Sequence, residues 1–271
     1  MLAAFLREDI GTGDITSQSI IAPELAAKAE IICKTNTTAV VCGLEEAEII
    51  FDICGCKSQS LVEDGSYAKK GKRVMIITGK ARDILKAERV ALNLIMRMSG
   101  IATETRHLAN SAKGLQVLAT RKTAPGLRYF DKKAVVVGGG GAHRMRLDDI
   151  VLIKDNHVAL AGSTTECIRL AKKNIGSTIK VECEVKNTKE ALDAISAGAD
   201  IVMLDNFTPK QASAAIRQIE RRGLRKKAKI EISGGVNSKN IRQYAKAKPD
   251  FISLGYITHS AKAVDFSLEI I

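Results

Sequence analysis

Basic side chains are frequent in the short stretch from residue 119 to residue 157, where apolar runs and four consecutive glycines separate them. They include Arg121, Lys122, Arg128, His143, Arg144 and Lys154. An Arg guanidinium binds a carboxylate as a planar bidentate partner, whereas a Lys ammonium supplies a compact point charge. For any one of these residues alone, a surface ion pair is the simpler interpretation. Burying several unpaired cations is costly, so Arg121, His143, Arg144 and Lys154 together indicate a site for a small molecule with more than one carboxylate.

Two acidic side chains end neighbouring strand-like segments and are expected to point toward these cations. They are Glu184 in VECEV and Asp205 in LDNF. Carboxylates that face a phosphate-binding region usually bind Mg²⁺ or sugar hydroxyls, and they can also stabilise a developing sugar cation. A simple charge balance against Lys154 is the alternative that the sequence leaves open.

Two glycine-containing segments have the composition of phosphate-binding loops. Ser233, Gly234 and Gly235 precede a helix that is expected to open at residue 237 or 238, and the free N–H groups of a helix N-terminus bind phosphate. Gly255 and the following residues through His259 repeat this arrangement one strand later. Two adjacent segments of this kind fit a sugar phosphate.

From about residue 93 onward, short apolar segments alternate with helical patterns. The segments with the character of buried strands are 115–120, 134–138, 149–155, 178–185, 200–206, 228–235 and 250–255. The helical patterns include 164–174, 187–199, 208–223 and 237–248. Buried strands separated by helices predict a parallel sheet covered on both faces. Seven strands favour an α/β barrel, complete or incomplete, over an open dinucleotide-binding sheet, whose GxGxxG motif is also missing.

The polar residues named above fall at the carboxyl ends of these predicted strands. In α/β barrels the active site gathers at this end, and phosphates favour the last two loops. The sequence therefore predicts an active site there.

The first part of the chain has a different pattern and predicts a smaller α/β domain. Strand-like residues at 27–43 are followed by a helical pattern at 44–55 and by two predicted strands around a turn at 61–80. A long helix is expected from about residue 82 to residue 112, with an apolar stripe along one face.

Composition narrows the remaining possibilities. The apolar runs of this 271-residue chain are too short to span a membrane, and its first residues leave no room for a secretory signal, so a cytoplasmic location is expected. None of the six cysteines forms a CxxC pair, which favours reduced thiols. The net charge of +12 favours an anionic partner, but the basic run at 216–230 lacks the aromatic residues of a base-stacking surface, so no nucleic acid is expected.

Eight motifs spread over the whole chain are similar to those of the quinolinate phosphoribosyltransferases. They are LREDIGTGDITS (6–17), ERVALNLIMRMSGIAT (88–103), TRKTAPGLR (120–128), GGGGAHRMRLDDIVLIKDNH (138–157), VECEV (181–185), LDNF (204–207), ISGGV (232–236) and SLGYITHS (253–260). The resemblance implies an N-terminal α/β sandwich domain, residues 1–98 joined by the C-terminal segment 261–271, and an incomplete α/β barrel domain, residues 99–260. It also implies a homodimer, or a larger assembly of dimers, in which Arg89 of one subunit completes the site of the other.

The same resemblance implies the roles of the site residues. Arg89, Arg121, His143, Arg144 and Lys154 would bind the two carboxylates of quinolinate. Phosphoribosyl pyrophosphate and Mg²⁺ would contact Lys122, Glu184, Asp205, Ser233, Gly234, Gly235, Gly255 and His259. Among these, Lys122, Glu184 and Asp205 would be catalytic, and Glu184 and Asp205 would hold Mg²⁺ directly or through water. The implied product is nicotinate mononucleotide, formed with release of pyrophosphate and CO₂ in NAD biosynthesis.

Three other functions stay open from the sequence. A nicotinate phosphoribosyltransferase-like enzyme or a molybdenum-transport-associated homologue would have the same fold with another acceptor. A monocarboxylate would leave some of the clustered cations unmatched, which favours the dicarboxylate. A non-enzymatic module that binds RNA or polyphosphate would instead string its cations along one outer face.

Overall fold

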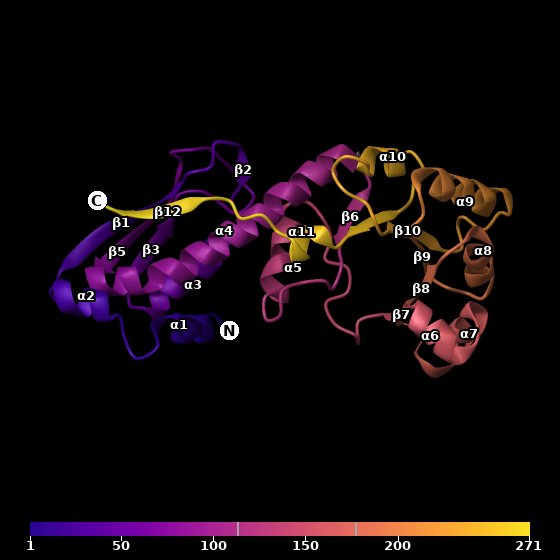
Figure 1. The fold of residues 1–271 in the computed structure, drawn as a ribbon, viewed down its shortest axis with the longest axis horizontal. Helices are drawn as coiled ribbons and strands as arrows, with labels where there is room; N and C mark the ends of the chain where they lie inside the picture. Colours follow the sequence, from indigo (N-terminus) through magenta and orange to yellow (C-terminus); the bar gives the residue numbers. More distant parts are fainter. Residues whose placement is uncertain (113, 177) are drawn as a thin grey trace. The chain divides into compact units, whose positions relative to one another are not determined.

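The computed structural model describes residues 1–112, 114–176 and 178–271. The chain forms two compact units (Figure 1). Unit 1 comprises Met1–Arg106, Tyr129–Gly138 and Ser260–Ile271, and unit 2 comprises His107–Arg128 and Gly139–His259. The predicted fold class, an α/β sandwich domain with an α/β barrel domain, is confirmed.

Unit 1 is built on a four-stranded antiparallel sheet in the order β12-β1-β5-β3. Its strands are β1 (Ala26–Cys33), β3 (Lys57–Ser60), β5 (Arg73–Lys80) and β12 (Phe266–Ile270), and a separate two-stranded sheet pairs β2 (Ala39–Val40) with β4 (Tyr67–Ala68). The helices that begin in this unit are α1 (Leu2–Ile10), α2 (Ile15–Ile20), α3 (Leu44–Ile53) and α4 (Ala81–Ala112). Because β12 pairs with β1, the last residues of the chain belong to this unit.

The segment 134–138, expected to be a strand, is instead the end of helix α5 (Arg128–Val137). Ala134 and Val135 are buried while Val136 is exposed, a pattern that a helix with one packed side produces. Asp131 on the same helix accepts two hydrogen bonds from Arg97 of α4, at 2.7 and 2.9 Å. These contacts place most of α5 in unit 1, although the sequence assigned the whole of 99–260 to the barrel domain.

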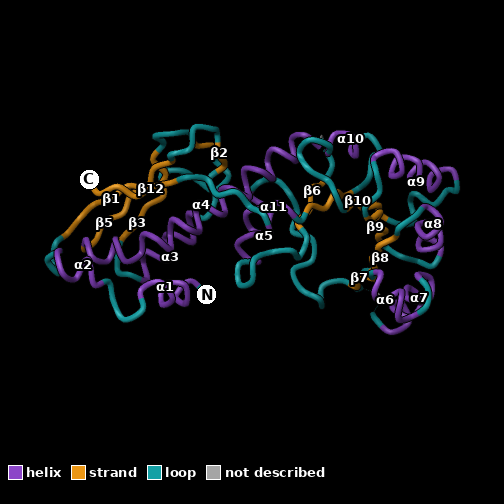
Figure 2. The backbone as a smooth tube through the Cα atoms, in the orientation of Figure 1, coloured by secondary structure: helices purple, strands orange, loops and turns teal. Residues whose placement is uncertain are grey.

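Unit 2 is built on a six-stranded parallel sheet in the order β6-β11-β10-β9-β8-β7. Its strands are β6 (Gln116–Ala119), β7 (Val151–Ile153), β8 (Val181–Val185), β9 (Ile201–Asp205), β10 (Lys229–Ser233) and β11 (Phe251–Leu254). The helices are α6 (Asp155–Ala161), α7 (Thr164–Asn174), α8 (Thr188–Ser196), α9 (Pro209–Arg221), α10 (Ile241–Ala245) and α11 (Tyr256–His259). Figure 2 shows the helices alternating with the strands around this unit.

The helices begin where the sequence provides capping residues. The side chains of Ser163, Asn187 and Thr208 each accept a backbone N–H in the first turn of the helix that follows, which satisfies a donor that the helix itself leaves unpaired. These local signals explain why α7, α8 and α9 lie within a few residues of the predicted ranges.

The barrel has six strands rather than seven, and β6 and β7 are the two edges of the described sheet. In place of a seventh strand, Gly141 forms a single bridge to β6. Its N–H donates to Val117 O at 2.8 Å, and its carbonyl accepts from Ala119 N at 3.1 Å. A Cβ at Gly141 would lie 2.6 Å from Leu118 Cδ2, so a larger residue here would require the Leu118 side chain to move.

Among the described helices, none combines the length and the apolar content needed to cross a bilayer.

Candidate active site

The carboxyl ends of the six parallel strands bring together polar residues that lie far apart in the sequence. Arg121 and Lys122 follow β6, Lys154 follows β7, Glu184 lies near the end of β8, Asp205 ends β9, Ser233 ends β10 and Gly255 follows β11. Because all six strands run in the same direction, these residues share one edge of the sheet.

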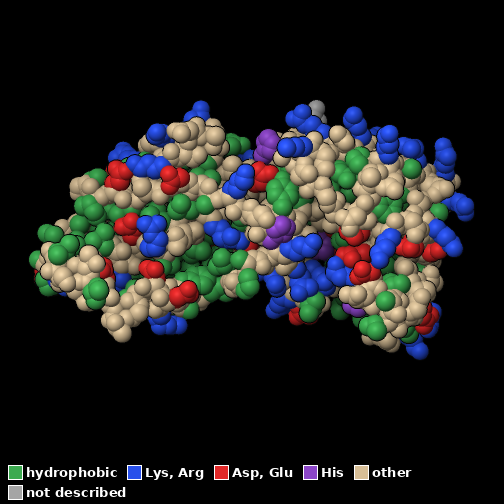
Figure 3. Space-filling view, in the orientation of Figure 1, with side chains coloured by type: hydrophobic (Ala, Val, Ile, Leu, Met, Phe, Trp, Pro, Cys, Tyr) green, Lys and Arg blue, Asp and Glu red, His purple; other side chains and the backbone are tan. Residues whose placement is uncertain are grey.

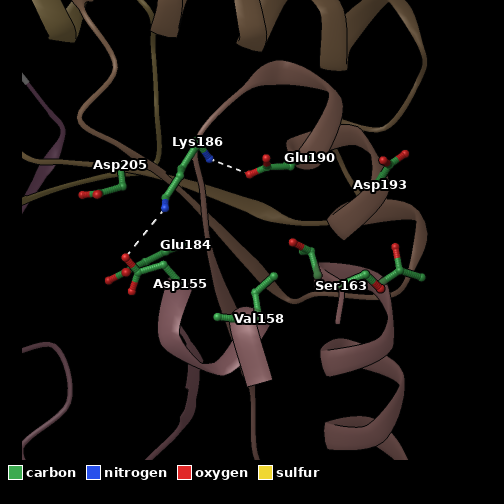
Figure 4. A pocket seen from close by; sticks show the side chains of 11 residues that line it. Asp155, Val158, Ser163, Glu184, Lys186, Glu190, Asp193 and Asp205 are labelled. Atoms are coloured by element: carbon green, nitrogen blue, oxygen red, sulfur yellow. Dashed lines mark hydrogen bonds and ion pairs between the residues drawn. The ribbon is translucent and has the colours of Figure 1, made fainter. Parts of the chain in front are cut away.

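An acidic pocket of about 450 Å³ opens beside the ends of β8 and β9 (Figure 4). Glu184, Asp205 and Asp155 contribute carboxylates to its lining. Lys186 lies between two of its acids: its Nζ is 3.7 Å from Asp155, and its backbone N–H donates to Glu190 at 2.8 Å. Open carboxylates of this kind are the oxygen ligands that Mg²⁺ prefers.

Lys154 forms an ion pair with Glu184. The Lys154 backbone N–H donates to His157 Nδ1 at 2.9 Å, so the histidine of the LIKDNH motif fixes the start of α6. The alternative left open by the sequence, a charge balance between Lys154 and Glu184, is therefore present in the structure. Glu184 also lines the acidic pocket, and a carboxylate that faces a pocket can exchange its partner for a ligand, so both roles are compatible.

Asn206 connects the acidic pocket to the Ser233–Gly235 loop. Its Nδ2 donates to Asp205 Oδ2 at 2.7 Å, and its backbone N–H donates to Ser233 O at 2.9 Å. Asn206 has a φ of 57°, a left-handed conformation that asparagine tolerates better than most residues. Gly234 packs directly on it, and a Cβ at Gly234 would lie 2.2 Å from Asn206 Oδ1.

The helix expected to open at residue 237 or 238 begins later, at Ile241. Asn237 Oδ1 accepts from Lys239 N at 2.9 Å, and Asn240 Oδ1 accepts from Asn237 N at 2.8 Å. These local side-chain bonds compete with helix formation. Any phosphate at this loop would therefore meet the backbone of Gly234 and Gly235, both left-handed, rather than a helix end.

Lys122, Gly255 and His259 lie side by side at the end of β11. A Cβ at Gly255 would lie 3.1 Å from Lys122 Cδ and 3.2 Å from His259 Cδ2. The hydroxyl of Thr258 donates to Lys122 O at 2.8 Å, which fixes the backbone that carries the lysine. The absence of a side chain on Gly255 thus lets the Lys122 stem pass close to the strand end.

His143 is held deeper in unit 2, between two fully buried carboxylates. Its Nε2 lies 3.2 Å from Glu182 Oε2 and 3.4 Å from Glu231 Oε2. Both glutamates have no exposed surface, and Ser253 donates to the other oxygen of Glu231. The ligand atoms of the three residues lie within 4.8 Å of one another, a geometry that could also hold a metal ion.

His143 and Glu182 hold their protons to higher pH than free groups do. Burial lowers the pKa of His143, but the close contacts with the Glu182 and Glu231 carboxylates and their negative charge outweigh burial and raise it to about 9. Burial also raises the pKa of Glu182. The Arg144 N–H donates to His143 Nδ1 at 2.7 Å, which requires that nitrogen to be unprotonated and so places the extra proton on a carboxyl group rather than on the ring.

Arg144 is buried, with 8% of its surface exposed, and donates to Ile150 O at 3.3 Å. Burial and then the neighbouring Arg121 guanidinium lower the pKa of Arg144. Arg121 Nε is also buried and has no hydrogen-bond partner in the described structure. Two adjacent guanidinium groups, one with an unsatisfied donor, form a suitable site for a carboxylate.

His143 and Arg144 border a second cavity, of about 280 Å³, and not the acidic pocket. Gln116, Ile201 and Phe251, the first residues of their strands, line the same cavity, so it reaches toward the amino ends of the strands. The structure therefore brings Arg121 near Arg144, and Lys154 to Glu184. Arg144 lines the second cavity, whereas Glu184 lines the acidic pocket.

Comparison with protein families identifies this chain. The model of the quinolinate phosphoribosyl transferase C-terminal domain matches residues 101–269, and that of the N-terminal domain matches residues 14–99. The chain belongs to the quinolinate phosphoribosyl transferase family.

Relatives of this family resemble the chain over its full length. A probable nicotinate-nucleotide pyrophosphorylase (carboxylating) from Methanocaldococcus jannaschii is 45% identical, and the match covers 100% of this chain and 96% of the relative. The solved nicotinate-nucleotide pyrophosphorylase from Francisella tularensis has a TM-score of 0.91 at 38% identity, covering 100% of this chain and 94% of that one. A human nicotinic acid phosphoribosyltransferase, 11% identical with a TM-score of 0.68 over 100% of this chain and 73% of that one, shares the fold alone.

Arg89 lies on α4 in unit 1, whereas the other site residues predicted for this family lie in unit 2. Its side chain is 58% exposed and lies 3.9 Å from Glu88. An exposed arginine on a well-formed helix is available to a partner molecule.

Glu182, Glu231 and Asn206 are the residues to which sequence reasoning assigned no role. Glu182 and Glu231 each stand two positions before a predicted site residue on the same strand, Glu184 and Ser233. Because side chains two apart on a strand face the same side, this spacing was a usable signal. The left-handed conformation of Asn206 has no comparable signal in the sequence.

Proposed function

We propose that this chain transfers the phosphoribosyl group of phosphoribosyl pyrophosphate to the nitrogen of quinolinate and releases CO₂, forming nicotinate mononucleotide. The observation that carries this proposal is the set of cations, carboxylates and glycine loops at one edge of the barrel of a chain that matches both domains of the family. The activity belongs to NAD biosynthesis and makes the chain a pentosyltransferase.

Quinolinate would be bound by the cations of unit 2. The guanidinium groups of Arg121 and Arg144 suit one carboxylate as bidentate partners, and the Lys154 ammonium suits the other. His143 would contribute by holding Arg144, since the protein already engages both of its ring nitrogens. Bringing the two groups of cations to one ligand requires Lys154 to leave Glu184 or the loop of Arg144 to adjust, a change that substrate binding can drive.

Phosphoribosyl pyrophosphate would be bound by the loops after β6, β10 and β11. The backbone of Ser233, Gly234 and Gly235 faces the 5′-phosphate in this proposal, and Gly255 with His259 supports the neighbouring loop. Lys122 is exposed at the same edge and would neutralise the leaving pyrophosphate.

The acidic pocket has the donor set for Mg²⁺. Glu184 and Asp205 offer carboxylate oxygens in one open pocket, and Asp155 lies beside them. Mg²⁺ bound there with the substrate would add charge neutralisation of the pyrophosphate to that from Lys122.

The chemistry needs no protein nucleophile. The pyridine nitrogen attacks C1 of the ribose as the C1–O bond to pyrophosphate breaks, and Glu184 and Asp205 stabilise the positive charge that develops on the sugar. The ring of the product is then a pyridinium. Its positive charge stabilises the electron pair left on carbon 2 when the adjacent carboxylate departs as CO₂, and that carbon then takes up a proton. The protein's contribution is positioning and electrostatics.

We also propose a homodimer in which the partner's copy of the Arg89 guanidinium reaches the quinolinate site. The exposure of Arg89 and its place outside unit 2 support this arrangement.

Product analysis tests the proposed function. The protein is incubated with phosphoribosyl pyrophosphate and Mg²⁺, and ring-labelled quinolinate or nicotinate is supplied in parallel reactions. Nicotinate mononucleotide and CO₂ from quinolinate alone are expected. Product from nicotinate alone would show that nicotinate, and not quinolinate, is the acceptor of an enzyme with the same fold. No product from either compound would contradict the proposal.

A further inference from the structure

The two glutamates beside His143 are fully buried polar groups of unit 2. Glu182 and Glu231 have no exposed surface, and both oxygens of Glu182 and Oε2 of Glu231 have no hydrogen-bond partner in the described structure. Removing a carboxylate from water is costly, and an ion pair does not always recover that cost. An apolar barrel interior would be the more stable solution, so a structural role alone does not explain two such residues on β8 and β10.

Both carboxylates converge on one atom, the Nε2 of His143, at 3.2 and 3.4 Å. The other ring nitrogen accepts the Arg144 N–H at 2.7 Å. The imidazole is thereby fixed at both ends, to the barrel strands on one side and to the backbone of the next residue on the other.

The backbone at His143 is left-handed, with a φ of 48°. This conformation is unfavourable for a residue with a side chain and persists only where surrounding contacts hold it. It sets the direction in which the chain enters Arg144, whose guanidinium is directed into the interior and donates to Ile150 O at 3.3 Å. The contacts that hold the ring therefore also decide where the Arg144 guanidinium lies.

We propose that Glu182 and Glu231 are positioning residues for the acceptor substrate: they clamp the His143 ring and, through it, set the Arg144 guanidinium before quinolinate binds. The inference rests on the proposed function. A guanidinium fixed in advance loses less conformational freedom when it binds a carboxylate, so the clamp should raise the affinity for the acceptor substrate. Phosphoribosyl pyrophosphate binds elsewhere in the proposal and should gain nothing.

Steady-state kinetics of Glu182→Gln and Glu231→Gln test the positioning role. Glutamine keeps the size of the side chain but replaces one carboxyl oxygen with an NH₂ group, which cannot accept a hydrogen bond from the imidazole. The expected result is a rise of about tenfold or more in KM for quinolinate, with KM for phosphoribosyl pyrophosphate within twofold of wild type, because about 1.4 kcal/mol of binding corresponds to a factor of ten. Glu182→Asp keeps the carboxyl group on a shorter side chain and should recover part of the affinity.

Two further variants separate this effect from a general loss of stability. Glu46 is a matched control: it is buried in unit 1, has an oxygen without a hydrogen-bond partner, and pairs with Lys133. Glu46→Gln should lower the melting temperature and leave both KM values unchanged. Ser253→Ala removes the hydroxyl that donates to Glu231. It should raise KM for quinolinate by a smaller factor, and it replaces the glutamate variants in this test if one of them fails to fold.

Each of the following results would overturn the inference. Equal changes in the two KM values, or a lower melting temperature with both unchanged, would leave a structural role only. Stoichiometric metal in the purified wild type that is lost in Glu182→Gln would identify a metal site instead. If wild-type protein does not turn over quinolinate, both the proposed function and this inference are wrong. If wild-type protein turns over quinolinate but the glutamate variants do not raise KM for quinolinate selectively, only this inference is wrong.

Discussion

At the scale of single residues, the proton retained by His143 and its carboxylate neighbours should make stability depend on pH. Burial raises the pKa of Glu182 above its ordinary value of 4.5, so its carboxyl group keeps a proton in the folded protein at pH values where the unfolded chain has lost it. The stabilisation is therefore complete below pH 4.5, and the free energy of unfolding should fall as the pH rises from there through the raised pKa. Urea denaturation of wild type and Glu182→Gln at several pH values measures this fall. The difference between the two proteins should shrink with rising pH, and a constant difference would contradict the prediction.

Asn206 should act on catalysis through the Asp205 carboxylate that it orients. Asn206→Gly keeps the left-handed backbone accessible and removes the hydrogen bond to Asp205, so activity should fall several-fold, as loss of a hydrogen bond to a charged group implies. Asn206→Ala removes the same bond and adds backbone strain, so its melting temperature should be lower than that of the glycine variant. Equal activity in wild type and Asn206→Gly would show that Asp205 is oriented by other contacts.

At the scale of elements, the turn after β10 depends on two adjacent glycines that differ in the space around them. Gly234 and Gly235 have φ values of 85° and 66°, but a Cβ at Gly234 would meet Asn206 at 2.2 Å whereas a Cβ at Gly235 would meet nothing within 4 Å. Gly235→Ala should therefore cost about 1 kcal/mol from the backbone alone. Gly234→Ala should cost at least twice as much and also raise KM for phosphoribosyl pyrophosphate. Thermal melts and kinetics of the pair measure both effects, and equal costs would mean that Asn206 moves aside freely.

The elements that the sequence predicted best are those with strong local signals. The five strands from β7 to β11 are short, apolar and followed by polar residues, and α7, α8 and α9 begin at capping side chains. The segment 134–138 was wrongly predicted as a strand, because four consecutive apolar residues fit a buried strand and the end of a helix equally well. Its conformation depends on tertiary contacts, such as the Arg97–Asp131 ion pair, which no local pattern contains.

The candidate site was predictable as a set of strand ends but not as a set of contacts. The position of each polar residue at a carboxyl end follows from the alternation of strands and helices. The engagement of His143 by Glu182 and Glu231 depends on its left-handed backbone and on the depth of the ring in unit 2. The start of α10 at Ile241 likewise depends on the side chains of Asn237 and Asn240, which form local bonds in place of a helical turn.

At the scale of the whole molecule, the excess of positive charge is not confined to the candidate site. Figure 3 shows Lys and Arg side chains along the outer edge of unit 2 over α9 and α10, where Arg221, Arg222, Lys226 and Lys227 are exposed. This surface resembles the row of cations that a polyanion-binding module would present. Family membership and the strand-end residues favour the enzyme, and for an enzyme with polyanionic substrates a positive field increases the rate of encounter.

The proposed dimer predicts that two inactive variants regain activity when they form a mixed dimer. If Arg89 acts in the partner's site, Arg89→Ala and Asp205→Asn homodimers should each be nearly inactive. A hybrid dimer of the two has one complete site, formed by the intact unit 2 of the first subunit and the Arg89 of the second. Random exchange in an equal mixture gives hybrids in about half of the dimers, each with one working site of two, so about a quarter of wild-type activity should return. To measure this recovery, the variants are refolded separately and as an equal mixture, and quinolinate turnover is compared between these samples. No recovery in a mixture shown by mass spectrometry to contain hybrid dimers would mean that Arg89 acts within its own chain or not at all.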